Sequence, residues 1–434
     1  MTVDRPRLLA SPASALVDAA VDVRVTGCRP RAAVTVRARV DDPLRGRWES
    51  RAVFEADAAG AVDLASARPV AGGYATADPF GLLWSLERDP ASAPLVGFAG
   101  PSGAVDVELA IEVDGAAADR VRIRRGFMGP GIAREPVRDD GLVGTFFAPA
   151  DGTARPGVLV VGGSDGGLSE GMAALLASHG FAVLALAYFR AEHLPPDLME
   201  IPLEYFETAI RWLGRQPSVA AGGLGVVGRS RGGELALLLA ATFPEITAVV
   251  GYVPSGVVHA GIAASPAAGA APRSAWTYRG KPLPFVPPPI DGRPPGPAAA
   301  SPEAPLELTP MFLKSLEDRA AVEAAAIAVE RIRGPVAPHL GRGRSPLALA
   351  GPRRDRGGQA GRPHARGDAS PLLGSRAHDR ARRAAGDGQH DPPSTPRSSD
   401  GARRDAGGQR RRGRRFLAPR PPVPAHGPRR ELER

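Results

Sequence analysis

The chain has 434 residues, of which 43% are hydrophobic, with 55 lysines and arginines against 46 acidic residues and a net charge of +9. Its single cysteine excludes a disulfide framework and a multi-cysteine metal cluster, and no run approaches the roughly 20 apolar residues of a membrane-spanning helix. The N-terminus, MTVDRPRLLASP, lacks an apolar core of signal-peptide length, so we expect a cytoplasmic protein without a membrane span.

The positive charge lies at the C-terminal end. Residues 337–434 hold 23 arginines, no lysine and nine acidic residues, a net charge of +14, whereas residues 1–336 hold 32 basic and 37 acidic residues, a net charge of −5. The tail also has one valine, one phenylalanine and no isoleucine, tyrosine, tryptophan or methionine. Because it cannot bury enough apolar surface to offset chain entropy, we expect residues 337–434 to be disordered. A single aromatic side chain offers little stacking for bases, which makes nucleic acid an unfavoured partner.

Residues 1–130 predict an all-β domain. Apolar and polar residues alternate in Ala33–Val40, Trp48–Ala56 and Val105–Val113, with Asp, Gly and Pro turns between these segments. A small antiparallel sandwich is the expected product of this pattern.

Residues 131–336 predict an α/β domain. Expected strands cover 157–163, 181–189, 223–228 and 246–254, and expected helices cover 169–180, 202–216, 232–243 and 317–334. Continuous apolar strands that alternate with helices are typical of a parallel sheet covered on both faces. The segment 263–305 is rich in Pro, Ala and Gly and predicts a loop or lid over the sheet edge.

The pattern G-x-S-x-G occurs twice, around Ser164 and around Ser230. A nucleophile elbow needs a strand that ends on the serine and a helix that starts directly after it, and Ser230 has this context, with LGVVG before it and GGELALLLA after it. Small residues at Gly228, Gly232 and Gly233 suit the tight strand–helix crossing. We therefore predict Ser230 as the nucleophile; the alternative is an ordinary helix N-cap in a Rossmann-like domain.

Ser164 lies in the glycine-rich run GGSDGG, after an earlier strand, where an α/β-hydrolase places the loop that donates the second oxyanion N–H. The predicted oxyanion hole consists of the backbone N–H of Arg231 and an N–H near Gly163 or Ser164. A plain turn or a phosphate-binding loop is the alternative, but GGSDGG lacks the lysine and spacing of a Walker motif and does not fit G-x-G-x-x-G.

Beyond these motifs, the sequence resembles the acyl-CoA thioesterase and bile acid-CoA:amino acid N-acyltransferase family from residue 15 to about residue 336. The segments that carry the resemblance are DPFGLLWSL, GGSDGGLSEGMAALLASHGFAVLALAYF, IPLEYFETAIRWL, GVVGRSRGGELALLLA and VERIRGPV. The resemblance implies an immunoglobulin-like N-terminal domain followed by an α/β-hydrolase domain. In that family the thioesterases have serine at the elbow and the amino-acid acyltransferase has cysteine, so Ser230 implies hydrolysis of an acyl-CoA thioester, without a cofactor or metal.

A serine nucleophile needs a histidine base and an acidic partner, in the chain order Ser, Asp, His. The family places the acid after a strand that should follow Val336 and the histidine one strand later, but the resemblance stops there and the sequence indicates no strand. We expect no triad Asp or His in frame. His179, His193 and His259 are expected to be surface or loop histidines, and His364, His378 and His390 lie in the tail.

A shifted reading frame explains this abrupt end. Read from the second base of each codon, the degenerate codons for Pro338–Leu349 permit ISGEDDRLWPS, and the same register over Gly374–Arg380 permits GAGHTIG. These resemble the family's acid and histidine segments in the right order. The preferred interpretation is therefore an acyl-CoA thioesterase-type serine hydrolase that is crippled as translated. The alternatives are another α/β-hydrolase esterase, similar to dienelactone hydrolase, and a non-enzymatic protein with a basic RNA-binding tail.

Overall fold

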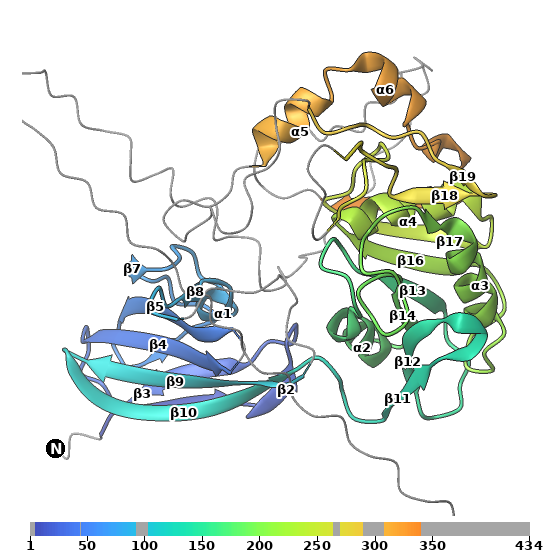
Figure 1. Cartoon of the computed structure of the whole chain (residues 1–434). Helices are drawn as coiled ribbons and strands as arrows, with labels where there is room; N and C mark the ends of the chain where they lie inside the picture. Colours follow the sequence, from blue (N-terminus) through green and yellow to red (C-terminus); the bar gives the residue numbers. More distant parts are fainter. Residues whose placement is uncertain (1–4, 44, 93–102, 264–269, 290–307, 340–434) are drawn as a thin grey trace, which may run out of the picture. The chain divides into compact units, whose positions relative to one another are not determined.

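A computed structural model of the chain describes residues 5–43, 45–92, 103–263, 270–289 and 308–339 (Figure 1). The chain divides into two compact units, Met1–Ala385 and Gly386–Arg434, and the second lies wholly outside the described residues. All but three residues of the tail 337–434 also lie outside them, so the disorder expected for it stays a prediction.

The N-terminal part contains two sheets that share one buried core. The strands are β1 (Arg7–Ser11), β2 (Ser14–Leu16), β3 (Asp22–Thr26), β4 (Ala33–Asp42), β5 (Gly46–Glu55), β6 (Val62–Asp63), β7 (Ala71–Gly72), β8 (Glu87–Arg88), β9 (Val105–Val113) and β10 (Ala116–Gly126), with one short helix, α1 (Gly81–Trp84). The small sheet has the order β1-β3-β6 and the large one β2-β10-β9-β4-β5-β7, with β8 also paired to β5.

Alternation along the strands builds this core. Val34, Val36 and Ala38 of β4 are fully buried, and they face Val25 of β3 within the same cluster. The three strands predicted from the sequence are thereby confirmed as β4, β5 and β9. The immunoglobulin-like topology of the two sheets stays a prediction.

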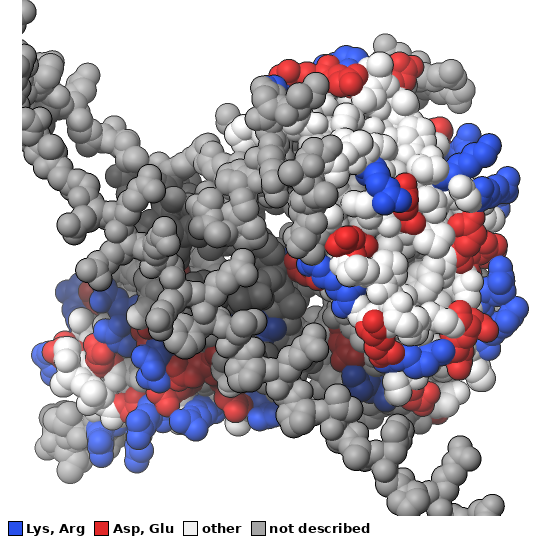
Figure 2. All heavy atoms as spheres, viewed as in Figure 1, with Lys and Arg blue, Asp and Glu red and all other residues white. Residues whose placement is uncertain are grey.

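The outer face of the large sheet carries charge pairs across its strands. The guanidinium of Arg37 on β4 lies 2.8 Å from the Glu112 carboxylate on β9, and Arg122 on β10 lies 3.5 Å from Glu108. Figure 2 shows basic and acidic side chains intermingled over the described surface in this view. Exposed pairs of this kind contribute about 1 kcal/mol or less each, so their main effect is to keep the surface charge mixed.

The second part is built on a seven-stranded sheet of order β11-β12-β14-β13-β16-β17-β20. Its strands are β11 (Ile132–Val137), β12 (Val143–Pro149), β13 (Gly157–Val161), β14 (Ala182–Ala187), β16 (Leu224–Arg229), β17 (Ile246–Tyr252) and β20 (Val336–His339). The first two pairings, β11 with β12 and β12 with β14, are antiparallel, and the other four are parallel. This order confirms an α/β domain.

Helices cover both faces of this sheet. Val158 and Val160 of β13 pack with α2 (Glu170–Ser178) on one face, whereas Leu159 and Val161 pack on the other face with α3 (Leu203–Gly214) and α4 (Arg231–Thr242). Every residue of β13 and β14 is buried. The carboxyl ends of β13, β14, β16 and β17 therefore share one edge of a rigid, two-sided sheet, which is where ligands bind in open α/β folds.

Residues 270–289, the described middle of the Pro-rich segment 263–305, differ from the loop or lid expected there. There β18 (Trp276–Tyr278) pairs with β15 (Ile201–Pro202) and with β19 (Lys281–Pro282), in a small sheet of order β15-β18-β19. Trp276 is fully buried, and its ring lies 5.8 Å from that of Tyr188 and 6.1 Å from that of Phe206. The segment thus contributes to the core.

The structure also differs from the sequence at the end of the described chain. Instead of one helix over 317–334 there are α6 (Arg319–Ala324) and a single 3-10 turn (Val329–Arg331), because Ile327 leaves the helical path and donates its N–H to Gly256 O (2.9 Å). A further helix, α5 (Thr309–Ser315), precedes them. The expectation of no strand after Val336 is wrong. β20 pairs with β17 through its backbone, while all four of its side chains are exposed, so no apolar pattern announces it.

Replacing Trp276 by alanine should lower the free energy of unfolding by about 3–5 kcal/mol, because it empties a large volume in the core. Urea denaturation followed by circular dichroism measures this loss. Trp212→Ala is the matched control, since Trp212 on α3 is only partly buried and should cost much less. Equal losses in the two variants would show that the Pro-rich segment does not contribute to the core.

Candidate active site

Ser230 lies at the junction of β16 and α4 in a strained backbone conformation. Its φ and ψ are 56° and −118°, values that L-residues rarely adopt, and its N–H donates to Tyr252 O of β17 (2.8 Å). Such a conformation costs about 1–3 kcal/mol and persists where the surrounding structure enforces it, most often at functional sites. A glycine would cost less here, so the side chain of Ser230 is itself the reason to bear the strain.

Glycines enforce this turn because three backbone segments cross next to it. A Cβ on Gly228 would lie 2.0 Å from the carbonyl oxygen of Gly232, and a Cβ on Gly232 would lie 2.2 Å from Gly162 O. A Cβ on Gly233 would lie 3.1 Å from the Cα of Pro254. The first turn of α4 therefore touches both the end of β16 and the glycine-rich loop after β13, which confirms the steric need for small residues.

The glycine-rich loop, residues 162–167, lies beside Ser230. A Cβ on Gly163 would lie 3.0 Å from Arg229 O and 3.6 Å from the Cβ of Ser230. The phenol of Tyr188 donates to Gly162 O (2.7 Å), and burial raises the pKa of this phenol well above its ordinary value, so it stays a donor. Of the two predicted loop residues, Gly163 is buried and Ser164 is partly exposed.

The first turn of α4 begins directly after Ser230. Arg231 is the first residue of α4, where an α-helix offers its N–H no acceptor of its own. The positive end of the dipole of this 12-residue helix adds to the field there. That these N–H groups form the predicted oxyanion hole stays a prediction.

The described histidines differ in their surroundings. His179 and His193 are exposed, as expected, and His179 precedes β14, at the sheet edge opposite Ser230. His259 lies in the loop after β17, which was one of its two expected settings, but it is not a surface residue: it is 8% exposed because residues 254–262 fold over the first turn of α4. The sequence analysis overlooked His339, whose ring stacks on Tyr252 with centroids 4.9 Å apart. His364, His378 and His390 lie outside the described residues.

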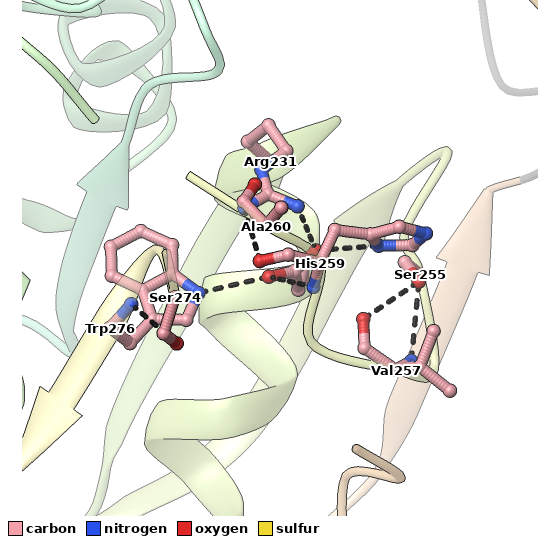
Figure 3. A network of polar contacts seen from close by, with 8 residues as sticks. Arg231, Ser255, Val257, His259, Ala260, Ser274 and Trp276 are labelled. Carbon is pink, nitrogen blue, oxygen red and sulfur yellow. Dashed lines mark hydrogen bonds and ion pairs between the residues drawn. The ribbon is translucent and has the colours of Figure 1, made fainter. Parts of the chain in front are cut away.

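A buried polar network centred on Glu234 is the main feature that the sequence analysis missed. Figure 3 labels its partners Arg231, His259 and Trp276. Glu234 is fully buried on α4, one turn after Ser230, and contacts side chains from three separate segments: Arg231, His259 and Trp276. An acidic residue in the first turn of a helix is ordinary in a sequence, so only its burial and its partners reveal it.

Two further searches cover the described part of the chain alone. No group of three or more His, Cys, Asp or Glu side chains there is arranged to hold a metal ion. None of the described helices is long and apolar enough to cross a membrane. The expected absence of a metal and a cofactor stays a prediction.

Comparison with known families and proteins gives matches in both parts. Residues 18–139 match the family described as acyl-CoA thioester hydrolase/BAAT N-terminal region, and residues 201–265 match BAAT/acyl-CoA thioester hydrolase C terminal. Acyl-coenzyme A amino acid N-acyltransferase 1 of Mus musculus is 36% identical over 254 residues, which cover 56% of this chain and 61% of that protein. Acyl-coenzyme A thioesterase 1 of Homo sapiens is 40% identical over 240 residues, covering 54% and 56% respectively. The chain thus matches less than two thirds of each relative's length.

Solved structures give a more distant likeness. The esterase Est22 is 18% identical, with a TM-score of 0.25, over 30% of this chain and 46% of that one. A hypothetical protein of Pseudomonas aeruginosa is 21% identical, with a TM-score of 0.26, over 30% and 45%.

The glycine crossing at the candidate nucleophile generates a direct prediction. Gly228→Ala should lower the melting temperature by several degrees, because its Cβ would meet a backbone oxygen that has no room to move. Gly225→Ala on the same strand is the control, since its Cβ would lie at an ordinary 3.5 Å from Val158. Thermal unfolding monitored by circular dichroism compares them, and equal melting temperatures would contradict the crossing described above.

Proposed function

We propose that the chain, whose two parts match family models of acyl-CoA thioester hydrolases, is a serine-dependent acyl-CoA thioesterase with Ser230 as nucleophile. The observation that carries the proposal is the strained backbone of Ser230 between β16 and α4, with the backbone of Gly163 directly beside its Cβ. Serine at this position favours hydrolysis over transfer to an amino acid, since the acyltransferases that the sequence resembles have cysteine there.

In the proposed reaction the Oγ of Ser230 attacks the thioester carbonyl carbon, and a base removes its proton. The carbonyl oxygen becomes an oxyanion that accepts from the N–H of Arg231 and from an N–H of Gly163 or Ser164. The C–S bond then breaks, the CoA thiolate leaves, and an acyl-serine remains. Water attacks the acyl-serine, which releases the free acid and returns the proton to Ser230.

None of the described histidines is placed to act as the base for Ser230. Of the described histidines, His179 lies at the wrong sheet edge, His193 is exposed and His259 points its Nδ1 at Glu234. His339 stands at the end of β20, two strands from Ser230 in the sheet order, and stacks on Tyr252. We propose that a frame shift near codon 336 replaced the segments with the triad Asp and His, so that the chain as translated hydrolyses thioesters poorly.

This proposal is tested by the rate at which the chain hydrolyses a medium-chain acyl-CoA, measured as the appearance of the free CoA thiol. The chain as translated should be at least about 10³-fold slower than a chain whose frame is restored after residue 336, because a serine without its base is a weak nucleophile. Ser230→Ala in the restored chain should remove the gain.

Two outcomes would contradict the proposal. A chain as translated that is as fast as the restored chain would show that its own residues supply the base. A restored chain that hydrolyses p-nitrophenyl esters but not acyl-CoA would indicate a simple esterase instead.

RNA binding that is salt-dependent and lost on deletion of residues 337–434 would favour the non-enzymatic alternative.

A further inference from the structure

The carboxylate of Glu234 collects four donors inside the protein (Figure 3). Its Oε2 accepts from the guanidinium of Arg231 (2.7 Å) and from Nδ1 of His259 (3.2 Å). Its Oε1 accepts from the indole Nε1 of Trp276 (2.9 Å) and from the backbone N–H of His259 (3.4 Å). One side chain therefore joins α4, the loop after β17 and β18.

Arg231 is held from both sides of its guanidinium. Nη1 donates to Glu234, and Nη2 donates to the carbonyl oxygens of His259 and Ala260, both at 3.1 Å. The side chain of Arg231 is 10% exposed. The residue whose backbone N–H is proposed to bind the oxyanion is thus fixed through its own side chain.

The state of His259 follows from this arrangement. A carboxylate that is surrounded by donors acts as an acceptor, so Nδ1 of His259 is the donor in this contact. Nε2 is buried, and none of the described residues forms a hydrogen bond with it. The ring packs edge-on against Phe312 of α5. His259 therefore supports Glu234 with its Nδ1–H.

Stability alone does not explain a buried ion pair of this kind. Removing two charges from water costs several kcal/mol, and well-packed apolar residues of similar volume are often as stable. The ionic arrangement fixes the relative orientation of the side chains, since each donor has to meet a particular oxygen of the carboxylate. Here the oriented groups, Arg231 and Glu234, belong to the first turn of α4.

We propose that Glu234 is a positioning residue for the oxyanion hole: through Arg231, His259 and Trp276 it fixes the first turn of α4, and with it the N–H of Arg231 beside Ser230. The Pro-rich segment that bears Trp276 is then coupled to the reacting centre. This inference rests on the proposed function for the role of that N–H, but the fixing of the turn does not.

Glu234→Gln tests the inference in the full chain. A glutamine has the same shape, but its amide nitrogen cannot accept, so two of the four donors lose their acceptor whichever way the amide faces. Trp276→Phe removes one donor and keeps a ring. Glu207→Gln on α3 is the matched control, because Glu207 forms an exposed pair with Arg211 at 3.2 Å.

Two measurements are made on each variant. Amide hydrogen exchange reports on the N–H groups of Gly233 and Glu234, which donate to Ser230 O at 2.8 and 3.1 Å and so report on the order of the first turn. The rate at which a fluorophosphonate probe labels Ser230 reports on the oxyanion hole, and its dependence on probe concentration separates reactivity from binding. Ser230→Ala gives the background of labelling.

Glu234→Gln should raise exchange in the first turn and slow the labelling step, each by about 10-fold, with half-saturation unchanged; Trp276→Phe should give a smaller effect and Glu207→Gln none. Unchanged exchange, or labelling as fast as in the unaltered chain, would overturn the inference. If the unaltered chain labels no faster than Ser230→Ala, which the proposed loss of the base allows, exchange alone decides whether Glu234 fixes the turn. The proposed function fails if the chain whose frame is restored after residue 336 is not labelled either.

Discussion

The close approach of three backbone segments around Ser230 is the constraint on which the second part of the molecule depends. The end of β16, the first turn of α4 and the glycine-rich loop meet at distances that leave no room for a Cβ on Gly228 or Gly232. This crossing presses α4 onto the sheet, sets the strained backbone of Ser230 and brings Gly163 beside it. One steric condition thereby sets both the backbone conformation of the proposed nucleophile and the approach of the glycine-rich loop to it.

The polar network behind the crossing solves a different problem. Glycines allow segments to approach, but they also leave a turn free to move, because they lack side chains that pack. Glu234 and Arg231 compensate by anchoring the same turn to Trp276 and to the loop that contains His259. The glycines that let the segments pack closely would leave the first turn of α4 flexible, and the hydrogen bonds of Glu234, one helical turn after Ser230, hold that turn in place.

The sequence predicted those features that depend on neighbouring residues. Local pattern predicted four strands of the sheet, β13, β14, β16 and β17, and the three helices α2, α3 and α4. It also predicted the position of Ser230 between β16 and α4 and the small residues around it. Features that depend on distant partners were missed or wrong. Trp276 lies in a segment whose composition indicates a loop, and His259 resembles any loop histidine until Glu234 approaches it from another element. β20 has no apolar pattern, since it pairs with β17 through its backbone and its side chains stay exposed.

That manner of forming β20 has a consequence for how the molecule tolerates change at its sheet edge. Backbone pairing is indifferent to the side chains that the paired residues carry, and the neighbouring strand β17 accepts four exposed residues, one of them Pro338, without burying any. The seventh strand can therefore be rewritten without disturbing the six strands that precede it. A change of sequence at this edge would alter which side chains follow β20, and so which acid or base they could provide, while leaving the strands and the helix around Ser230 in place.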